Sequence, residues 1–391
     1  MRADNRAEND DLPIGWNLYT VNECCEIVNN LRKPIDEVER KNMQGTYPYY
    51  GPTKIQDYID SYAYEGKYAL IGEDGDHFLK YAEWDMTLLV EGKFNVNNHA
   101  HVVKGTERCI AEWFALYFRH KSIQASLTRQ GAKRYKLTKE ALSKLPIIVP
   151  SRKSEQEKIW ATISLWDNAI ELKEKLLEQK KLQKKGLMER LLTGKVRLPG
   201  FADEWKYHKA GELFSNSSNK RHSGIGEVLS SMQDRGIVPR SQVDIDIKYN
   251  VESVSSYKKV EAGDFVISLR SFQGGIEYSE YEGLISPAYT VLKNKKDIDV
   301  GFYKELFKSA NFIRRLNSVI YGIRDGKQIG YADFSTLTLP HPTKREQSAI
   351  AKVFQAANNE IAVLQNEITQ IKDQKKGLMQ LLLTGRVRVS C

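Results

Sequence analysis

The chain has 391 residues, a net charge of +9 at neutral pH and a hydrophobic content of 41%. This size allows two or three domains with separate cores, and the composition is typical of a folded chain rather than a disordered one. Because no apolar run approaches the roughly 18 residues of a membrane span and the polar N-terminus is unlike a signal peptide, we expect a cytoplasmic protein.

The first globular part, residues 1–150, consists of short elements. An amphipathic segment is expected over 19–28. The aromatic stretch 45–52 contains two prolines and is predicted to be a loop, because proline disrupts helix interiors. We predict a helix at 111–118 and strands at 68–71, 86–90, 100–103 and 145–150.

A long helix follows over 151–197, and its sequence is repeated. The stretch Gln183–Met188 returns as Gln374–Met379, and Leu191–Arg197 returns as Leu382–Arg388, both at an offset of 191 residues. The match continues without a gap back to Glu155-Gln156 in the first copy. Such an internal repeat fixes the architecture, so it is considered before any single motif.

Each copy also has a period of seven, in two interleaved series that are mostly apolar, which is typical of a coiled-coil seam. Each helix would span roughly 55–60 Å, and Gly194 and Gly385 stand where a C-cap glycine would end it. Two unrelated surface helices are the alternative, but such lengths are unusual in a compact core. The predicted core positions are Ile159, Ile163, Trp166, Ile170, Leu177, Leu187, Leu191, Ile350, Phe354, Ile361, Leu364, Ile368, Ile371, Leu378 and Leu382.

The second globular part, 198–341, follows the same plan more loosely, and the second long helix occupies 342–391. We predict a strand at 265–269, a helix at 302–316 and a strand at 337–340. The segment Arg270–Gly275 follows the first of these strands directly and is read as a turn whose glycines let the backbone approach a ligand.

The basic excess is confined to the two helical segments. Residues 151–200 carry 12 Lys or Arg against 7 Asp or Glu, and residues 341–391 carry 8 against 4, which accounts for the whole net charge. Charge is also segregated between 119 and 144, where eight basic residues stand with one acid. A positive charge favours a polyanionic partner, and the 119–144 stretch faces either phosphates or solvent.

Motifs for catalysis are weak. The chain has no glycine-rich nucleotide loop and no Asn/Asp-Pro-Pro-aromatic motif of an amino-methyltransferase. Asp76 or Asp85, followed by Glu91 and Lys93, resembles the Mg²⁺ site of a nuclease, but this pattern is short and has no equivalent in the second copy. The cysteines Cys24, Cys25, Cys109 and Cys391 have no CxxC spacing, so we expect reduced structural thiols and no metal site.

Residues suited to DNA recognition are found in both globular parts. Arg, Lys, Asn and Gln read base edges, and any polar group binds phosphate. The segment around Arg270 is the sharpest candidate, with a plain hairpin turn as the alternative. The predicted DNA-binding residues are Tyr47, Tyr49, Tyr50, Lys54, Asn97, Asn98, Arg129, Lys133 and Arg134 in the first part, and Lys220, Arg221, Arg235, Arg240, Arg270, Ser271, Gln273, Arg324, Lys327 and Gln328 in the second.

Over essentially its full length the chain resembles the specificity (S) subunit of type I restriction-modification systems. The resemblance rests on Glu155-Gln156 and Glu346-Gln347, each shortly after a proline, and on the two Lys-Lys-Gly-Leu-Met…Leu-Leu-Thr-Gly stretches. The aromatic loop at 47–51 and the segment 265–275 also look like target recognition sequences.

The resemblance implies an α/β (α+β) fold with two target recognition domains in a pseudo-symmetric repeat, separated by two long helices packed as an antiparallel coiled coil. The implied domains are 1–150, 151–197, 198–341 and 342–391. Each recognition domain would read half of a gapped site in double-stranded DNA, and the helices would set the gap. The subunit would have no catalysis or cofactor of its own.

The implied partners are two methyltransferase (modification) subunits and, in a full complex, two restriction (translocase-nuclease) subunits. S-adenosylmethionine (SAM), ATP and Mg²⁺ are then expected on these partners, and base flipping belongs to the methyltransferase. The alternatives are an autonomous Mg²⁺-dependent nuclease and a coiled-coil scaffold that binds only protein. DNA cleavage by the isolated chain would favour the first, and absence of sequence-specific DNA binding would favour the second.

Overall fold

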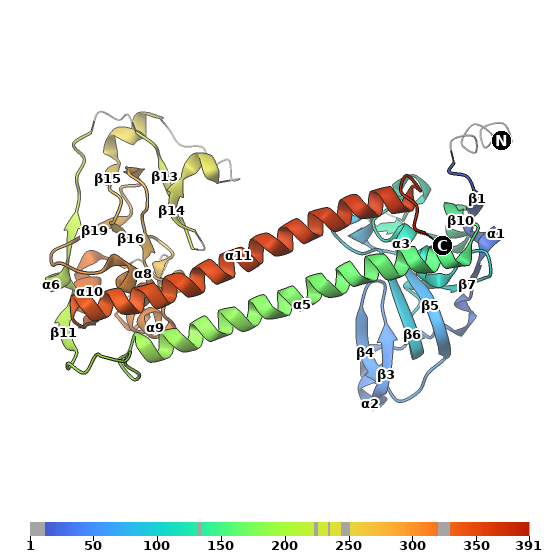
Figure 1. Cartoon of the computed structure of the whole chain (residues 1–391), viewed down its shortest axis with the longest axis horizontal. Coiled ribbons are helices and arrows are strands. Elements are labelled where there is room, and N and C mark those ends of the chain that lie inside the picture. The colour runs from blue at the N-terminus through green and yellow to red at the C-terminus, as the bar shows by residue number, and fades with distance from the viewer. Residues whose placement is uncertain are drawn as a thin grey trace. The chain divides into compact units, whose positions relative to one another are not determined.

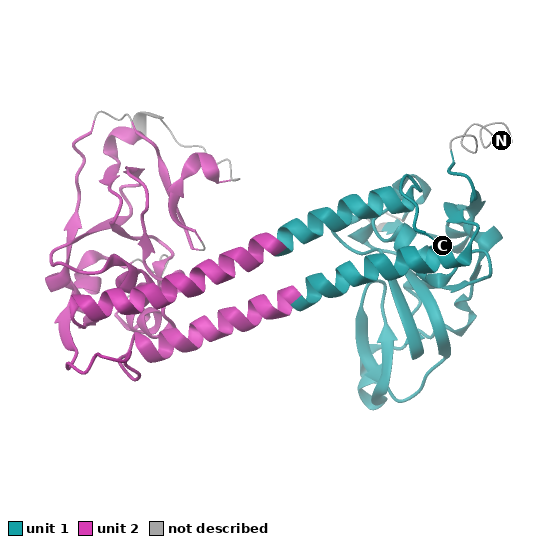
Figure 2. Ribbon diagram, viewed as in Figure 1, with its two compact units in different colours: residues 1–172, 368–391 teal, residues 173–367 magenta. Residues whose placement is uncertain are grey.

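The computed structural model describes residues 12–130, 134–222, 226–233, 235–243, 251–319 and 329–390. The chain divides into two compact units, of which unit 1 comprises residues 1–172 and 368–391 and unit 2 comprises residues 173–367 (Figure 2). The long helices α5 (Lys153–Leu191) and α11 (Lys344–Leu383) each contribute one part to each unit.

Unit 1 is built on a six-stranded mixed sheet that helix α3 covers (Figure 1). α3 (Ala111–Phe118) is almost wholly apolar in sequence, and all its residues except Glu112 are buried. Neighbouring strands are antiparallel except β3 and β6, which are parallel. The strand order is β2 (Cys25–Ile27), β7 (Ala100–Gly105), β5 (Tyr64–Gly72), β6 (Thr87–Val96), β3 (Gln44–Tyr50) and β4 (Ile55–Ile59).

Smaller elements complete unit 1. β1 (Trp16–Thr20) pairs antiparallel with β10 (Pro146–Pro150), and β8 (Thr128–Gln130) forms a hairpin with β9 (Arg134–Lys136). The short helices are α1 (Val21–Cys24), α2 (Glu37–Asn42) and α4 (Lys139–Lys144).

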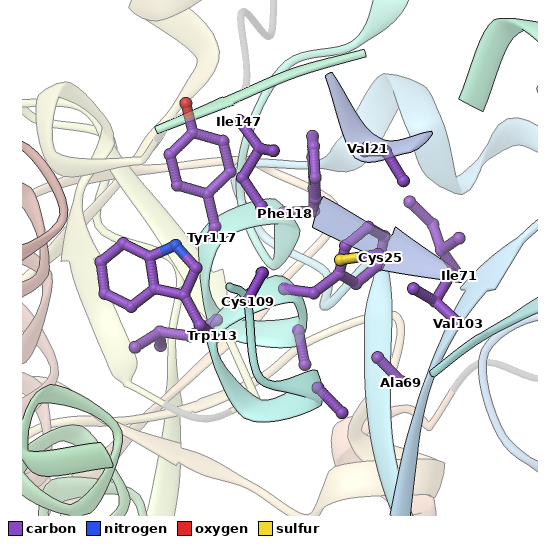
Figure 3. Close-up of a cluster of buried hydrophobic side chains, with 14 of the residues drawn as sticks. Val21, Cys25, Ala69, Ile71, Val103, Cys109, Trp113, Tyr117, Phe118 and Ile147 are labelled. Carbon is purple, nitrogen blue, oxygen red and sulfur yellow. The ribbon is translucent and has the colours of Figure 1, made fainter. Parts of the chain in front are cut away.

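The main core of unit 1 joins the sheet to the long helices. Figure 3 shows Trp113, Tyr117 and Phe118 of α3 in the same buried cluster as Ile71 and Val103 of the sheet. The cluster also includes residues from both long helices, namely Ile159, Ile163, Met379 and Leu382. The helices are therefore rooted in the globular core rather than attached to its surface.

Unit 2 contains a four-stranded antiparallel sheet and three two-stranded pairs. The sheet order is β12 (Phe214–Ser217), β19 (Thr290–Asn294), β16 (Phe265–Ile267) and β17 (Glu277–Tyr278). The pairs are β11 (Lys206–Lys209) with β20 (Thr338–His341), β13 (Leu229–Met232) with β14 (Gly236–Pro239), and β15 (Lys258–Val260) with β18 (Gly283–Ile285). The remaining helices are α6 (Ala210–Leu213), α7 (Ser271–Gly274), α8 (Val300–Lys308), α9 (Ala310–Ser318) and α10 (Tyr331–Thr336).

Several predicted elements need correction. The single helix expected over 302–316 is two helices, because Ser309 interrupts the helix after α8 and its hydroxyl accepts the backbone N–H of Phe312 to begin α9. The loop expected at 45–52 is mostly strand β3, which includes Pro48 and has irregular pairing with β4. The segment 19–28 is divided among β1, α1 and β2, and the strand predicted at 265–269 ends at Ile267.

Within each unit the two long helices lie side by side and antiparallel (Figure 1). In unit 1 Asp167 is paired with Lys375, and Glu155 near the start of α5 with Arg388 beyond the end of α11. In unit 2 Lys173 and Lys180 bind Glu367 and Glu360 at 2.7 and 2.6 Å. In both units, residues later in α5 pair with residues earlier in the C-terminal helical segment. The two helices therefore run antiparallel.

The predicted coiled-coil core residues all lie inward. Ile159, Ile163, Ile170, Leu191, Ile350, Phe354, Leu364, Ile368 and Leu382 are buried, and the others are half-buried. Lysines occupy the polar positions of the same series and form ion pairs there. None of the described helices combines the length and apolar character that a membrane span requires.

The repeated sequence builds the same clamp in each unit. The carboxylate of Glu346 near the start of α11 accepts hydrogen bonds from Arg197 Nε and Nη2 at 2.6 and 2.7 Å and from Trp205 Nε1 at 3.0 Å. In unit 1, Glu155 is bound in the same way by Arg388 Nη2 at 2.7 Å and by Trp16 Nε1 at 3.4 Å. Each clamp joins the end of one long helix to the start of the other.

The glutamine after each clamp glutamate anchors the helix start. Gln156 Oε1 accepts the backbone N–H of Ile110 at 3.0 Å, and Gln347 Oε1 accepts that of Asp299 at 2.8 Å. Both glutamines are completely buried. The Glu-Gln pair in each repeat therefore has a structural role that its spacing in the sequence did not indicate.

Candidate nucleic-acid interface

In unit 1 several predicted DNA-binding residues line one polar cleft of about 500 Å³. Asn97 and Asn98 follow β6, and Tyr49 belongs to the neighbouring strand β3. The sequence reasoning missed the other polar members, which are Asp36, Glu39, Arg40, Gln56 and His99. Amides, carboxylates and a guanidinium are the groups that read base edges, so the cleft has suitable chemistry.

Within the cleft, Asn97 holds the Gln56 side chain in place. Asn97 is buried, and its Nδ2 donates to Gln56 Oε1 at 2.9 Å while its Oδ1 accepts the backbone N–H of His99 at 2.8 Å. The Gln56 side chain is exposed and its amide is oriented by this bond. Gln56 is therefore a better candidate for base contact than Asn97, because Asn97 is buried and its Nδ2 and Oδ1 each already bind the protein.

The aromatic candidates of β3 have different roles. Tyr49 is fully buried, and its hydroxyl accepts Ile35 N–H at 3.0 Å and donates to Lys33 O at 2.7 Å, so it supports the cleft from within. Tyr50 is half-buried and packs edge-on against Phe94. Tyr47 lies against the exposed ring of Tyr62, with ring centroids 5.0 Å apart.

Tyr62 extends this surface to a cation. Lys93 Nζ lies 4.5 Å from the centroid of the Tyr62 ring. An aromatic pair beside a lysine can stack on a base or bind a phosphate. Lys54, in the turn between β3 and β4, is also exposed.

The basic hairpin β8–β9 is fixed to the sheet at its base. Glu73 binds Lys136 of β9 at 3.2 Å and Arg32 at 2.6 Å, and Leu137 N–H donates to Glu73 O at 2.7 Å. Burial raises the pKa of Glu73, but hydrogen bonds from Arg32 and Lys136 hold it below its usual range. A negative charge thus anchors the strand of a positive hairpin.

Arg129 on β8 is exposed and its guanidinium lies over the ring of Tyr135, 5.3 Å from the centroid. This contact holds the side chain along the hairpin, in a position to meet a phosphate. Lys133 and the side chain of Arg134 lie outside the described residues, so their predicted role stays a prediction.

In unit 2 the β13–β14 hairpin meets the segment that was singled out from the sequence. Gln233 Nε2 is 3.5 Å from Arg270 O, and Lys308 Nζ donates to Gln233 O at 3.3 Å and to Gly274 O at 3.0 Å. Arg270 and Gln273 are exposed, so both can reach a ligand. Gln233 and Lys308 are members of this surface that the sequence reasoning missed.

Two details of the Arg270 segment differ from expectation. The segment is the one-turn helix α7 rather than an open turn, and Ser271 is buried, where its hydroxyl accepts the backbone N–H of Ser268 at 2.9 Å. Gly275 has a φ of 81°, and a Cβ there would lie 2.0 Å from Phe307 O. This glycine permits close packing against α8, not the approach of a ligand.

The other candidates of unit 2 are distributed around these elements. Lys220 and Arg221 are exposed after β12, and Arg235 is exposed in the β13–β14 turn with its Nη2 3.1 Å from Gln242 O. Arg240 is half-buried and its Nε donates to Ser230 Oγ at 3.3 Å. Arg324, Lys327 and Gln328 lie outside the described residues.

The nuclease-like residues do not converge. Asp85 lies 3.2 Å from His120 Nε2, Glu91 lies 3.5 Å from Lys67, and Lys93 is over Tyr62. In the described part of the chain, the one group of three or more potential metal ligands is formed by cysteines and contains none of these carboxylates. The contacts of Asp85, Glu91 and Lys93 thus give no support to an Asp…Glu-x-Lys metal site.

Comparison with known families identifies the class of the chain. Residues 13–181 match the model of the type I restriction modification DNA specificity domain. A type I restriction enzyme specificity subunit of Methanocaldococcus jannaschii, MjaX, described as putative, is 24% identical over 98% of this chain and 96% of its own. The chain therefore contains a type I restriction modification DNA specificity domain, and it is similar to a type I restriction enzyme specificity subunit over nearly its full length.

One bacterial relative is closer over a shorter segment. A specificity subunit of Haemophilus influenzae, also described as putative, is 39% identical over 132 residues, which are 33% of this chain. The match spans 32% of that relative's length. A DNA specificity domain is thus supported by sequence over residues 13–181.

Solved structures show the same fold as this chain. The S subunit from M. genitalium superposes with a TM-score of 0.62 at 14% identity, covering 96% of this chain and 97% of that one. A chain from a structure on complex assembly and conformational transition of the type I R-M system gives 0.58 at 15% identity, covering 96% and 100%. The predicted α/β fold class with two long antiparallel helices is confirmed.

Proposed function

We propose that this specificity subunit reads a bipartite DNA sequence, with one half-site recognised by each unit and without catalysis of its own. The observation that carries the proposal is the repetition. Each unit presents its own polar candidate interface, and each is tied to the helix pair by the same Trp-Glu-Arg clamp. Two separate DNA-binding surfaces, each attached to the helix pair, are better suited to two half-sites than to one continuous site.

The long helices would set the unread gap between the half-sites. α5 has 39 residues and α11 has 40, so each is roughly 58–60 Å long. Ion pairs along the seam, such as Lys180 with Glu360 at 2.6 Å, fix the register of one helix on the other. A defined register would make the gap a property of the protein rather than of the DNA.

The same helices would dock the methyltransferase subunits. On α5 the side chains of Leu165 and Leu172 in unit 1 and Leu182 in unit 2 are 69%, 66% and 67% exposed. Large exposed leucines on a helix are typical of a surface that another protein covers. SAM, ATP and Mg²⁺ would be held by the partner subunits, two methyltransferases and, in a full complex, two restriction subunits.

The proposal that the long helices set the gap is tested by inserting one heptad into both helices, at matched positions. Seven residues add about 10 Å of helix, the length of about three base pairs. The recognised DNA, read as the methylated motif in cells that also contain the partner subunits, should keep both half-sites and gain a longer gap. A changed half-site with a constant gap would overturn the proposal.

A matched control replaces seven residues within each helix by a different heptad of the same apolar pattern. The length is then unchanged, so the recognised motif should be unchanged too. If this variant also alters the gap, the effect comes from local packing rather than from helix length.

A further inference from the structure

The core of unit 1 contains a group of three cysteines that no part of the proposed function uses. Cys24 ends α1, Cys25 begins β2, and Cys109 stands two residues before α3. The three sulfur atoms lie within 4.8 Å of one another, and those of Cys24 and Cys25 are 3.9 Å apart. Figure 3 shows Cys25 and Cys109 among the side chains of this buried cluster.

We propose that Cys24, Cys25 and Cys109 bind one soft, thiophilic metal ion of the copper(I) class. An ion about 2.3 Å from each of three sulfurs in one plane separates these sulfurs by about 4.0 Å. The measured 3.9 Å for one pair agrees with this, and the upper limit of 4.8 Å for the others requires a contraction of less than about 1 Å. The sulfur spacing is therefore close to that of a trigonal site.

The backbone holds the three cysteines together without a metal. Thr106 Oγ1 donates to Cys24 O at 2.6 Å, and Thr106 N–H donates to Cys109 O at 2.8 Å, so one residue connects both ends of the group. Cys25 is directly paired with Gly105 in the β2–β7 ladder. The ligands are thus preorganised by two strands and a turn, and metal binding needs little rearrangement.

The ligand set selects the type of ion. In the described part of the chain no His, Asp or Glu joins the three cysteines, whereas a structural zinc ion almost always takes four ligands. Thiolates favour soft ions such as copper(I). All three cysteines are at most 5% exposed, so an ion held by them would be shielded from solvent.

Metal binding has consequences for protons and for stability. A metal ion binds the thiolate form of cysteine, so coordination would release the protons of the thiols to solvent. Binding would also connect the α1–β2 junction to the turn before α3, and it would stabilise the folded state by mass action.

The test uses the full-length, reduced protein under anaerobic conditions, titrated against copper(I) held by bicinchoninate, whose colour reports the metal that it loses. We expect one equivalent of copper(I) to be withdrawn, with a rise in the melting temperature. Cys24→Ser, Cys25→Ser and Cys109→Ser should each lose this equivalent. Cys391→Ser is the control and should retain it.

A second measurement avoids folding defects in the variants. In the wild-type protein, copper(I) should slow the alkylation of Cys24, Cys25 and Cys109 relative to Cys391, as read by peptide mass spectrometry. If no copper(I) is withdrawn, or if it protects Cys391 equally, the three thiols are ordinary core side chains and the proposal is wrong. Capture of zinc(II) in place of copper(I) would also contradict it.

Discussion

Arg388, three residues from the end of the chain, binds the carboxylate of Glu155 with Nη2 and Oε2 2.7 Å apart, across 233 residues of sequence. Arg388 Nη1 also donates to Ile14 O at 2.7 Å, so the last residues close on the first strand region of unit 1. Arg197 and Glu346 form the equivalent contact in unit 2, at 2.6 Å. Each unit therefore depends on residues from distant parts of the chain.

Removing either clamp arginine should destabilise the unit that contains it. Arg197→Met leaves the carboxylate of Glu346, 1% exposed, without its charged partner, and we expect a loss of about 2–3 kcal/mol. Arg388→Met should cost less, about 1–2 kcal/mol, because the Arg388 side chain is 41% exposed and solvent already screens the pair. Urea unfolding measures the change in the free energy of unfolding of each variant, and hydrogen exchange shows in which unit stability is lost.

Matched controls for the clamp stand two residues earlier in each repeat. Lys195→Met and Arg386→Met remove exposed cations from the same tails and should change stability by at most a few tenths of a kcal/mol. If Arg388→Met weakened unit 2 as much as unit 1, the assignment of this clamp to unit 1 would be wrong.

A second pair of equivalent positions differs in charge between the repeats. In unit 1 Asp167 is bound by Lys375 and by Arg119, whose Nη1 lies 2.7 Å from the carboxylate. In unit 2 the equivalent residue is Asn358, whose Nδ2 donates to Glu305 at 2.8 Å, and Lys184 binds the same glutamate at 2.9 Å. The carboxylate therefore belongs to α5 in unit 1 and to α8 in unit 2. In both units it is paired with the equivalent lysine of the helix pair, Lys375 or Lys184.

Asn358→Asp should therefore place two carboxylates in contact and destabilise unit 2 by about 1–3 kcal/mol. Glu305→Gln combined with Asn358→Asp restores one negative charge beside Lys184, as in unit 1, and should recover most of the loss. A double-mutant cycle by chemical denaturation measures this coupling. If the loss of stability in the double variant equalled the sum of the losses in the two single variants, the two positions would not interact.

These clamps also show how far the sequence could be read. The seven-residue period and the 191-residue offset predicted two paired helices, since both depend on local spacing. The partners of Glu155 and Gln156 depend on contacts between residues far apart in sequence, which spacing does not encode. For the same reason Cys109 could not be placed beside Cys24, although each cysteine was noted individually.

The candidate interface was predictable by residue type but not by exposure. Arg270, Gln273 and Asn98 are exposed as a DNA-contacting residue requires, whereas Ser271 and Tyr49 face the interior. Polar side chains in short strands and turns serve either role, and packing decides between them. Gln56 was missed because nothing in the local sequence marks it, and the bond from Asn97 that orients it depends on residues far apart in sequence.

The stability of unit 1 should depend on pH through His101. This residue is 1% exposed, with Nε2 2.7 Å from Leu137 O and Nδ1 2.8 Å from Asn29 Nδ2. Asn29 Oδ1 already accepts Val102 N–H at 3.0 Å, so the amide cannot turn without losing this bond. His101 is therefore held in the neutral form, with its proton on Nε2.

Burial lowers the pKa of His101 from 6.5. The unfolded chain then binds more protons than the folded chain below pH 6.5, so the stabilising contribution is present above that pH and is lost as the pH falls through the folded pKa. We expect the free energy of unfolding of unit 1 to fall below pH 6.5, and to fall less in His101→Gln. Identical pH profiles for the two proteins would contradict this.

Base-reading and phosphate-binding residues should be separable by mutation. Gln56→Ala and Arg270→Ala should each relax recognition at one or two positions of a different half-site, at a cost of about 1–3 kcal/mol for each lost base contact. Lys54→Ala should weaken binding to all sequences alike. It should also reduce the slope of the logarithm of the binding constant against the logarithm of the salt concentration by about one. Competition binding with randomised DNA distinguishes these outcomes, and a loss of specificity in Lys54→Ala would reverse the assignment.

The central claim, that this chain gives a modification complex its sequence specificity, is tested most directly by the adenine methylation of a genome with and without its gene. Cells that contain the gene and its partner subunits should show one methylated motif made of two short defined parts and a constant unspecified gap. Deleting the gene should remove that motif completely and leave all others in place. Unchanged methylation, or the loss of a continuous motif without a gap, would contradict the account.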